Sequence, residues 1–154
     1  MLTLRRFLAV LALAVAVAVV AAAPGGAQSA TTKCTAFAQL KPGNEVPPTD
    51  SRTSGAAVLH INGTRLSFAV AIANPERERF FAGHIHIGGP TVNGPVRVLL
   101  FSGSNDRRLF TQVDSFDIGD NAAAICGDLG GHYVNYHTDD HPGGALRGQL
   151  VRLF

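Results

Sequence analysis

The chain lacks the sequence features of nucleic-acid binders, nucleotide-binding enzymes and serine hydrolases. Beyond the N-terminal segment the only adjacent basic residues are Arg107 and Arg108, so no basic surface for a nucleic acid is expected. No G-x-S-x-G sequence supplies a nucleophilic serine. The glycines stand at turns rather than in a phosphate-binding loop. These absences argue against three large classes of function.

The first residues have the composition of a secretory signal peptide. Arg5 and Arg6 precede an apolar run over residues 7–23, which a short stretch of small residues follows. This order predicts a signal peptide over residues 1–27, with cleavage at its end or after Ala23. The alternative is a retained single-helix anchor, although the run is at the short end of what crosses a bilayer.

Without the leader the chain carries no net charge. The whole sequence has 13 Lys and Arg against 11 Asp and Glu, and the leader holds two of the arginines. Residues 28–154 therefore form a neutral chain, long enough for one domain with its own core. We expect a protein that is secreted, extracellular or in the cell envelope, with no membrane attachment once the leader is removed.

Only two cysteines are present, Cys34 and Cys126. In an exported protein they are expected to form a disulfide, closing a loop of roughly 90 residues. Two free thiols or a pair of soft-metal ligands are the alternatives. Their distance in sequence from the histidines described below favours the disulfide.

Short strand-like stretches separated by turn residues fill the rest of the chain. The predicted strands are residues 34–40, 54–61, 64–73, 80–87, 95–101, 132–138 and 144–153. Asn62-Gly63 predicts a two-residue hairpin turn. Residues 120–129 suit a short helix with Asp120 as its N-cap, and residues 102–120 receive no assignment. The pattern predicts an all-β fold, a Greek-key-like β-sandwich or barrel with at most one short helix.

The histidines fall on one face of two predicted strands. Side chains alternate along a strand, so His84 and His86 lie opposite the apolar Ile85 and Ile87, which suit the core. In residues 132–138, Val134 and Tyr136 suit the core, which leaves Tyr133, Asn135 and His137 on the other face. If the two strands share a sheet, the three histidines lie together.

Three imidazoles on one face are ligands suited to copper or zinc. His84, His86 and His137 are the candidate ligands, with His141 available from the adjacent turn. A His-x-His pair on a Greek-key strand is similar in pattern to copper,zinc superoxide dismutases. The alternative is that these histidines are half-exposed polar residues bonded to carbonyls or carboxylates, as expected for His60 and His132.

Three sequence blocks together resemble the CHRD domain, a family named for its occurrence in chordin and found widely in bacterial exported proteins. The blocks are residues 44–48 with 54–55, residues 82–86 with 93–96, and residues 133–138 with 142–150. Their combination, in this order, extends from about residue 35 to the end of the chain. The resemblance implies a β-domain over residues 28–154, and the occurrence in chordin suggests an extracellular protein partner.

The sequence therefore predicts an exported, non-enzymatic protein with no catalytic residues assigned and a copper or zinc site at His84, His86 and His137. An extracellular protein-interaction module that holds no metal is one alternative. A copper-dependent, superoxide dismutase-like oxidoreductase is the other.

Overall fold

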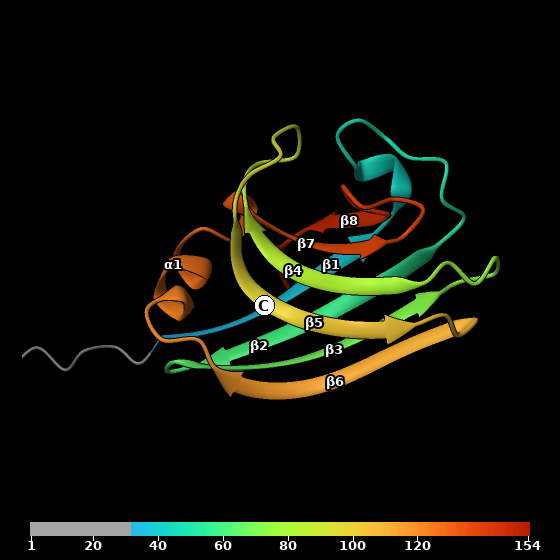
Figure 1. Ribbon diagram of the computed structural model, residues 1–154. Coiled ribbons are helices and arrows are strands. Elements are labelled where there is room, and N and C mark those ends of the chain that lie inside the picture. The colour runs from blue at the N-terminus through green and yellow to red at the C-terminus, as the bar shows by residue number, and fades with distance from the viewer. Residues whose placement is uncertain (1–31) are drawn as a thin grey trace, which may run out of the picture.

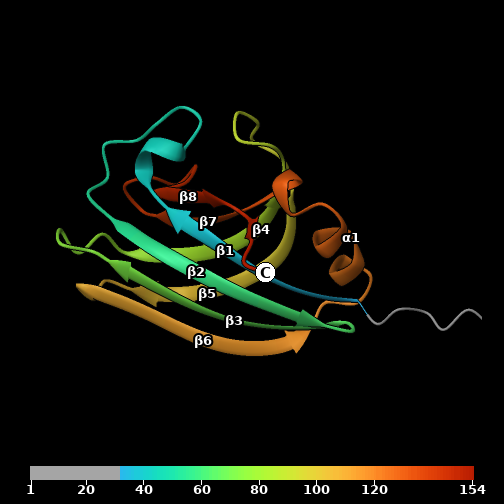
Figure 2. The same cartoon turned by 180° about the vertical axis from the view of Figure 1, so that it is seen from behind.

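The computed structural model describes residues 32–154, in which two antiparallel sheets pack face to face (Figures 1 and 2). The larger sheet has the order β6 (Leu109–Asp117), β3 (Arg65–Ala73), β2 (Ser54–Asn62), β1 (Lys33–Leu40), β9 (Val151–Arg152). The smaller sheet has the order β5 (Val96–Asn105), β4 (Phe80–Ile87), β7 (His132–Thr138), β8 (Leu146–Gln149). The predicted all-β sandwich is confirmed, and the strands of these residues form no closed barrel. The predicted signal peptide, residues 1–27, lies outside the described residues.

The hairpin between β2 and β3 forms one residue later than predicted. Asn62 pairs with Arg65, so the two-residue loop is Gly63-Thr64 rather than Asn62-Gly63. Gly63 has a φ of 62°, and no other residue of this loop has a positive φ. A loop with glycine first needs the left-handed region only at that glycine, whereas an Asn-Gly loop needs it at both positions.

The segment without a predicted structure completes β5 and forms β6. β6 pairs with β3 along its whole length and forms one edge of the larger sheet. Of its nine residues only Phe110 is buried, while Leu109 and Val113 are exposed. An edge strand with so little buried surface has no clear apolar alternation, which is why the sequence pattern did not reveal it.

The last predicted strand, residues 144–153, is two strands in different sheets. β8 pairs with β7, and β9 pairs with β1 in the opposite sheet. Leu150 lies between them, 1% exposed. The crossing from one sheet to the other depends on pairing partners far away in sequence, so local alternation could not predict it.

A short helix, α1 (Asn121–Gly127), lies at one end of the sandwich beside the start of β1 (Figure 1). Asp120 occupies the N-cap position as predicted, but it has helical dihedrals and its side chain makes no capping hydrogen bond within the described residues. A disulfide between Cys34 and Cys126 joins β1 to this helix, which confirms the predicted pairing.

Two short 3-10 turns, η1 (Pro42–Asn44) and η2 (Leu129–Gly131), complete the fold. Within residues 32–154 no helix is long and apolar enough to cross a membrane.

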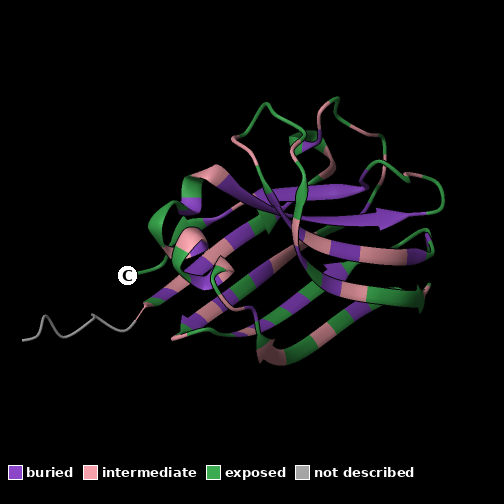
Figure 3. Cartoon of the chain, turned by 60° about the vertical axis from the view of Figure 1, so that its left-hand side comes forward, coloured by how far each residue is buried: buried purple, intermediate pink, exposed green. Residues whose placement is uncertain are grey.

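The core lies between the sheets, but β7 is buried on both of its faces. All seven of its residues are buried, and Figure 3 shows it as an unbroken purple strand. Val134 and Tyr136 belong to the apolar core. The polar side chains of the opposite face must therefore be covered from outside the sandwich, and loops cover them. This covered polar face holds the candidate site.

Candidate functional site

The outer face of the smaller sheet brings the predicted histidines together. In the pairing of β4 with β7, His84 is opposite Asn135, His86 is opposite Tyr133, and Ala82 is opposite His137. Register shifts between these two strands occur only before Ala82, so they do not disturb the alternation at the histidines. The predicted shared sheet and the predicted face of the histidines are both confirmed. Ile87, predicted to enter the core with Ile85, is instead 39% exposed at the end of β4.

His84, His86 and His137, which we call the histidine trio, converge on one point. One nitrogen from each ring lies within 4.8 Å of the other two. Nδ1 of His84 is 3.2 Å from Nε2 of His137, and the ring centroids of His84 and His86 are 5.3 Å apart. Two of the three are well covered, since His86 and His137 are each 8% exposed, and His84 is half-buried.

Backbone carbonyls determine which nitrogen of two of these rings carries the proton. Nδ1 of His86 lies 2.9 Å from the carbonyl oxygen of Gly94, and Nδ1 of His137 lies 3.0 Å from that of Pro142. A carbonyl can only accept, so each Nδ1 is the donor and each Nε2 presents a lone pair. Nε2 of His86 is buried and makes no hydrogen bond with any residue of the part of the chain that the structure describes. The two rings are thus held with an electron-pair donor directed at the trio's centre.

The surroundings keep all three imidazoles neutral at pH 7. Burial, then the neighbouring His137 and His86, lowers the pKa of His84 to about 4. Burial also lowers the pKa of His86 and of His137, partly opposed in each by the carbonyl that accepts its N–H. Desolvation disfavours the charged imidazolium, and a second positive ring nearby disfavours it further. Neutral rings with free lone pairs are the form that binds metal ions.

Tyr133 and Arg147 position His86 and the loop beside it. The ring of His86 stacks on Tyr133, with centroids 4.9 Å apart and an interplanar angle of 8°. The guanidinium carbon of Arg147 lies 3.3 Å from the centroid of the same tyrosine ring. The Tyr133 hydroxyl accepts a hydrogen bond from the Gly94 amide, 3.1 Å away. The residue whose carbonyl orients His86 is therefore itself held in place.

Arg147 is buried, but its N–H groups bond to the loop that follows β4. They donate to the carbonyls of Gly89 and Val92 at 2.6 and 3.1 Å, and to the side-chain oxygen of Asn93 at 3.3 Å. The role of Arg147 is to close the loop over the outer face of the sheet.

The structure places His141 in a different cluster from the histidine trio. Its Nε2 lies 3.7 Å from a carboxylate oxygen of Asp50 and 3.8 Å from one of Glu78. Glu78 is buried and also accepts hydrogen bonds from Ser51 and Thr138. The predicted fourth ligand therefore faces carboxylates rather than the centre of the trio.

The other two histidines of the described chain lie outside the trio, as predicted. Nδ1 of His132 is 2.6 Å from the carbonyl of Asp128, and its Nε2 accepts from Arg97 at 3.3 Å. His60 stands on the outer face of the larger sheet, 2.9 Å from the Thr35 hydroxyl.

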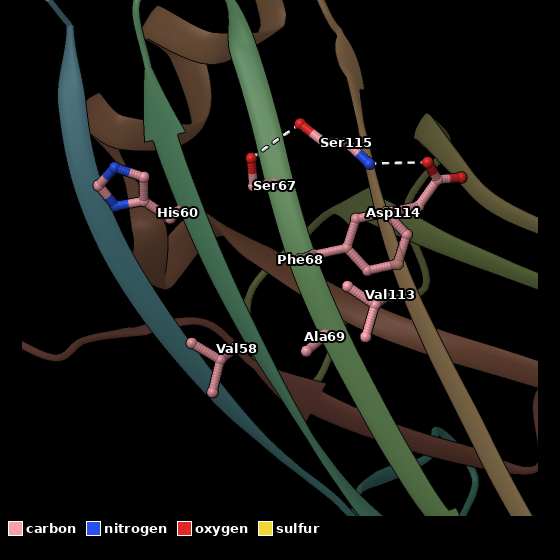
Figure 4. Close-up of a pocket in the computed structure, with 8 residues that line it drawn as sticks. All are labelled: Val58, His60, Ser67, Phe68, Ala69, Val113, Asp114 and Ser115. Carbon is pink, nitrogen blue, oxygen red and sulfur yellow. Dashed lines mark hydrogen bonds between the residues drawn. The ribbon is translucent and has the colours of Figure 1, made fainter.

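A shallow groove surrounds His60 on that outer face, across β2, β3 and β6 (Figure 4). Exposed Val58 and Val113 stand along it, 41% and 82% exposed. Ser67 and Ser115 bond to each other at 2.8 Å across two of the strands. With a single histidine and Asp114 as its only carboxylate, this groove offers no comparable set of metal ligands.

Sequence reasoning missed the backbone groups that orient the trio. The carbonyls of Gly94 and Pro142 come from loops, and any residue type can present a carbonyl there, so no side-chain pattern reveals them. It also gave no role to Asn135, although alternation placed its side chain on the correct face. Asn135 lies directly across from His84, and its Oδ1 is buried with no hydrogen-bond partner within residues 32–154.

Comparison with curated proteins found no match, and comparison with solved structures found none. A family model does match: the CHRD domain model covers residues 36–150, most of the chain. The match includes both histidine strands and the loops that cover them. The chain belongs to the CHRD domain family.

Proposed function

We propose that this protein binds one transition-metal ion, copper or zinc, through His84, His86 and His137. The observation that carries the proposal is the convergence of three neutral imidazoles, two of them held by carbonyls with Nε2 directed inward. Metal-binding histidines commonly donate their second nitrogen to a carbonyl or carboxylate in this way. A histidine with a purely structural role would satisfy both nitrogens with other residues. Nε2 of His86 has no partner among residues 32–154, whereas that of His137 lies 3.2 Å from Nδ1 of His84.

The spacing of the trio suits one ion. Two nitrogens that bind the same copper or zinc ion at about 2.0–2.1 Å lie at most ~4.2 Å apart. The 3.2 Å between His84 and His137 is within this limit. The 4.8 Å that bounds all three separations exceeds it by roughly 0.6 Å, a difference that small rotations of the rings can close.

The ligand set selects among metals by its chemistry. Imidazole nitrogen suits zinc and copper, whereas calcium and magnesium prefer oxygen ligands. Three protein ligands also leave a coordination position for a water molecule or another small ligand. A bound copper ion would supply redox chemistry and a bound zinc ion would supply a Lewis acid, and the superoxide dismutase-like alternative requires copper with measurable turnover.

We infer further that the protein acts outside the cytoplasm. The disulfide between Cys34 and Cys126 is compatible with an oxidising compartment, where such bonds persist. The signal-peptide composition of residues 1–27 supports the same destination. N-terminal sequencing of the protein from the culture medium or cell envelope of its host tests this; an intact N-terminus in the cytoplasmic fraction would contradict it.

Calorimetric titration of the metal-free protein with zinc, and separately with copper, tests the metal proposal. We expect a 1:1 stoichiometry and a loss of more than about 100-fold in affinity for His86→Ala, since removing a ligand costs more than removing a residue that orients one. His60→Ala is the matched control, because His60 lies on the other sheet, and should bind as the unmodified protein does. Equal affinity in the two variants, or no binding of either ion, would overturn the proposal.

A protein-interaction module is the second candidate, favoured by the exposed valines on the larger sheet. Val58 and Val113 border the groove of Figure 4, on the sheet opposite the trio. Under this alternative a partner would bind without metal, Val113→Asp would weaken that binding, and His86→Ala would leave it unchanged. Partner binding that is unchanged in Val113→Asp and weakened in His86→Ala would favour the metal site.

A further inference from the structure

A cavity of about 270 Å³ lies between the segment after η1 and the β7–β8 turn. Figure 1 shows both segments on the same side of the smaller sheet. Pro142, whose carbonyl orients His137, forms part of its wall, so the cavity adjoins the trio without including any of its three rings.

A buried carboxylate lines this cavity with one oxygen unpaired. Glu45 is 5% exposed, and its Oε1 is buried and has no hydrogen-bond partner among the described residues. The neighbouring Asn135 side chain lowers the pKa of this carboxyl, an effect smaller than that of burial. A buried carboxylate oxygen without a donor is costly, so this atom indicates that a donor belongs there.

Three side chains on the cavity wall can donate, and none is directed to Glu45: the ring of His141 has its Nε2 nearest Asp50 and Glu78, at 3.7 and 3.8 Å. The Thr49 hydroxyl donates to the carbonyl of Ala145 at 3.0 Å, and the Asn93 amide donates to the carbonyl of Val46. Asp140 adds a second, exposed carboxylate at the rim. The side chains thus offer acceptors and negative charge, which calls for a ligand that donates hydrogen bonds and carries positive charge.

Arg147 does not provide that donor. Its N–H groups are directed to Gly89, Val92 and Asn93, as described above. Although its charge lowers the pKa of Glu45, burial has the larger effect and raises it to about 7. The carboxylate therefore lacks the solvation or the direct counter-charge that would keep it ionised.

We propose that the cavity binds a primary alkylammonium group, from a free amine or from a lysine side chain of another protein. The ammonium would donate to Oε1 of Glu45, and its methylene chain would lie along the apolar walls formed by Val46, Pro47 and Pro142. A single available carboxylate oxygen suits an ammonium better than a guanidinium, which pairs with both oxygens of a carboxylate. This inference does not depend on the metal proposal.

Titration of the metal-free protein with n-butylammonium, followed by the amide NMR signals of Gly143 and Gly144, tests the proposal. We expect saturable shifts, and an affinity lower by about tenfold or more in Glu45→Gln, which retains the shape of the side chain but loses its charge. Asp106→Asn is the control, since Asp106 pairs with Arg77 away from the cavity. Nα-acetyl-lysine methylamide distinguishes the two sources: binding as tight as that of butylammonium indicates that a lysine side chain fits, and binding of butylammonium alone indicates a free amine.

Two further ligands test the chemistry on the unmodified protein, whether or not the variant folds. Butan-1-ol keeps the chain without the charge, and butyltrimethylammonium keeps the charge without N–H donors. Both should bind about tenfold or more weakly than butylammonium. The absence of saturable shifts with butylammonium, equal shifts with either analogue, or unchanged affinity in a folded Glu45→Gln variant would overturn the proposal.

Discussion

Replacing Gly83 by alanine should displace the buried ring of Tyr136. The two residues face each other across β4 and β7, and a Cβ at Gly83 would lie 2.4 Å from Cε1 and 2.7 Å from Cζ of that ring. To regain an ordinary separation of ~3.5 Å the ring must move by about 1 Å. Tyr136 is 0% exposed and packs against Phe80 and Phe110, so its surroundings resist this movement.

The expected cost of Gly83→Ala is about 2–4 kcal/mol of unfolding free energy. Overpacking of a core costs about 1–3 kcal/mol, and loss of the hydrogen bond from the Tyr136 hydroxyl to Gln112 adds about 1 kcal/mol. Urea unfolding followed by circular dichroism measures the change. In a Tyr136→Leu background the ring is absent, and the same substitution should cost less than about 1 kcal/mol.

A Tyr136→Phe background is the matched control, because it keeps the ring and removes only the hydroxyl. There Gly83→Ala should still cost at least about 1 kcal/mol, the lower end of the overpacking range. Equal costs of Gly83→Ala in the Leu and Phe backgrounds would refute the reasoning, since the loss would then come from the strand backbone rather than from the ring.

Three further predictions concern the disulfide, the loop and pH. Reduction of the disulfide between Cys34 and Cys126, 92 residues apart, should lower the unfolding free energy by up to about 4–5 kcal/mol; an unchanged urea midpoint with both thiols free would contradict this. Arg147→Met removes the bonds that close the loop over the trio, and should weaken zinc binding by about 10- to 100-fold; unchanged affinity in a folded variant would show that the loop does not orient His86. The folded-state pKa of His84 is about 4, below its unfolded value of 6.5, so the unfolded chain binds the proton first and stability should fall between pH 6.5 and 4. Glu45, whose pKa is raised, has the opposite effect on stability in part of this range. The pH dependence of unfolding free energy is therefore compared between the metal-free protein and His84→Gln. The variant should lose less stability towards pH 4, and parallel curves would argue against the lowered pKa of His84.

The histidine trio could be predicted because its evidence is local alternation. His84 and His86 flank an apolar residue, and Val134 and Tyr136 identify the core face of β7. A strand with one apolar face determines which way its other residues point, and two such strands in one sheet bring their polar faces together.

What could not be predicted depends on loops or on pairing at long range. His141 follows a turn, where no alternation fixes its direction, and it faces Asp50 and Glu78. The division of residues 144–153 between two sheets depends on β7 and β1, which lie far apart in the sequence. The cavity at Glu45 needs two loops to meet, and only the folded chain brings them together.

The most direct test of the metal centre is anomalous X-ray diffraction from crystals grown with zinc, and from a second set grown with copper. We expect one anomalous peak per chain at about 2.0–2.1 Å from one ring nitrogen each of His84, His86 and His137. A peak at His141, Asp50 and Glu78 instead, or ordered crystals with no peak at the trio, would contradict the proposed metal site.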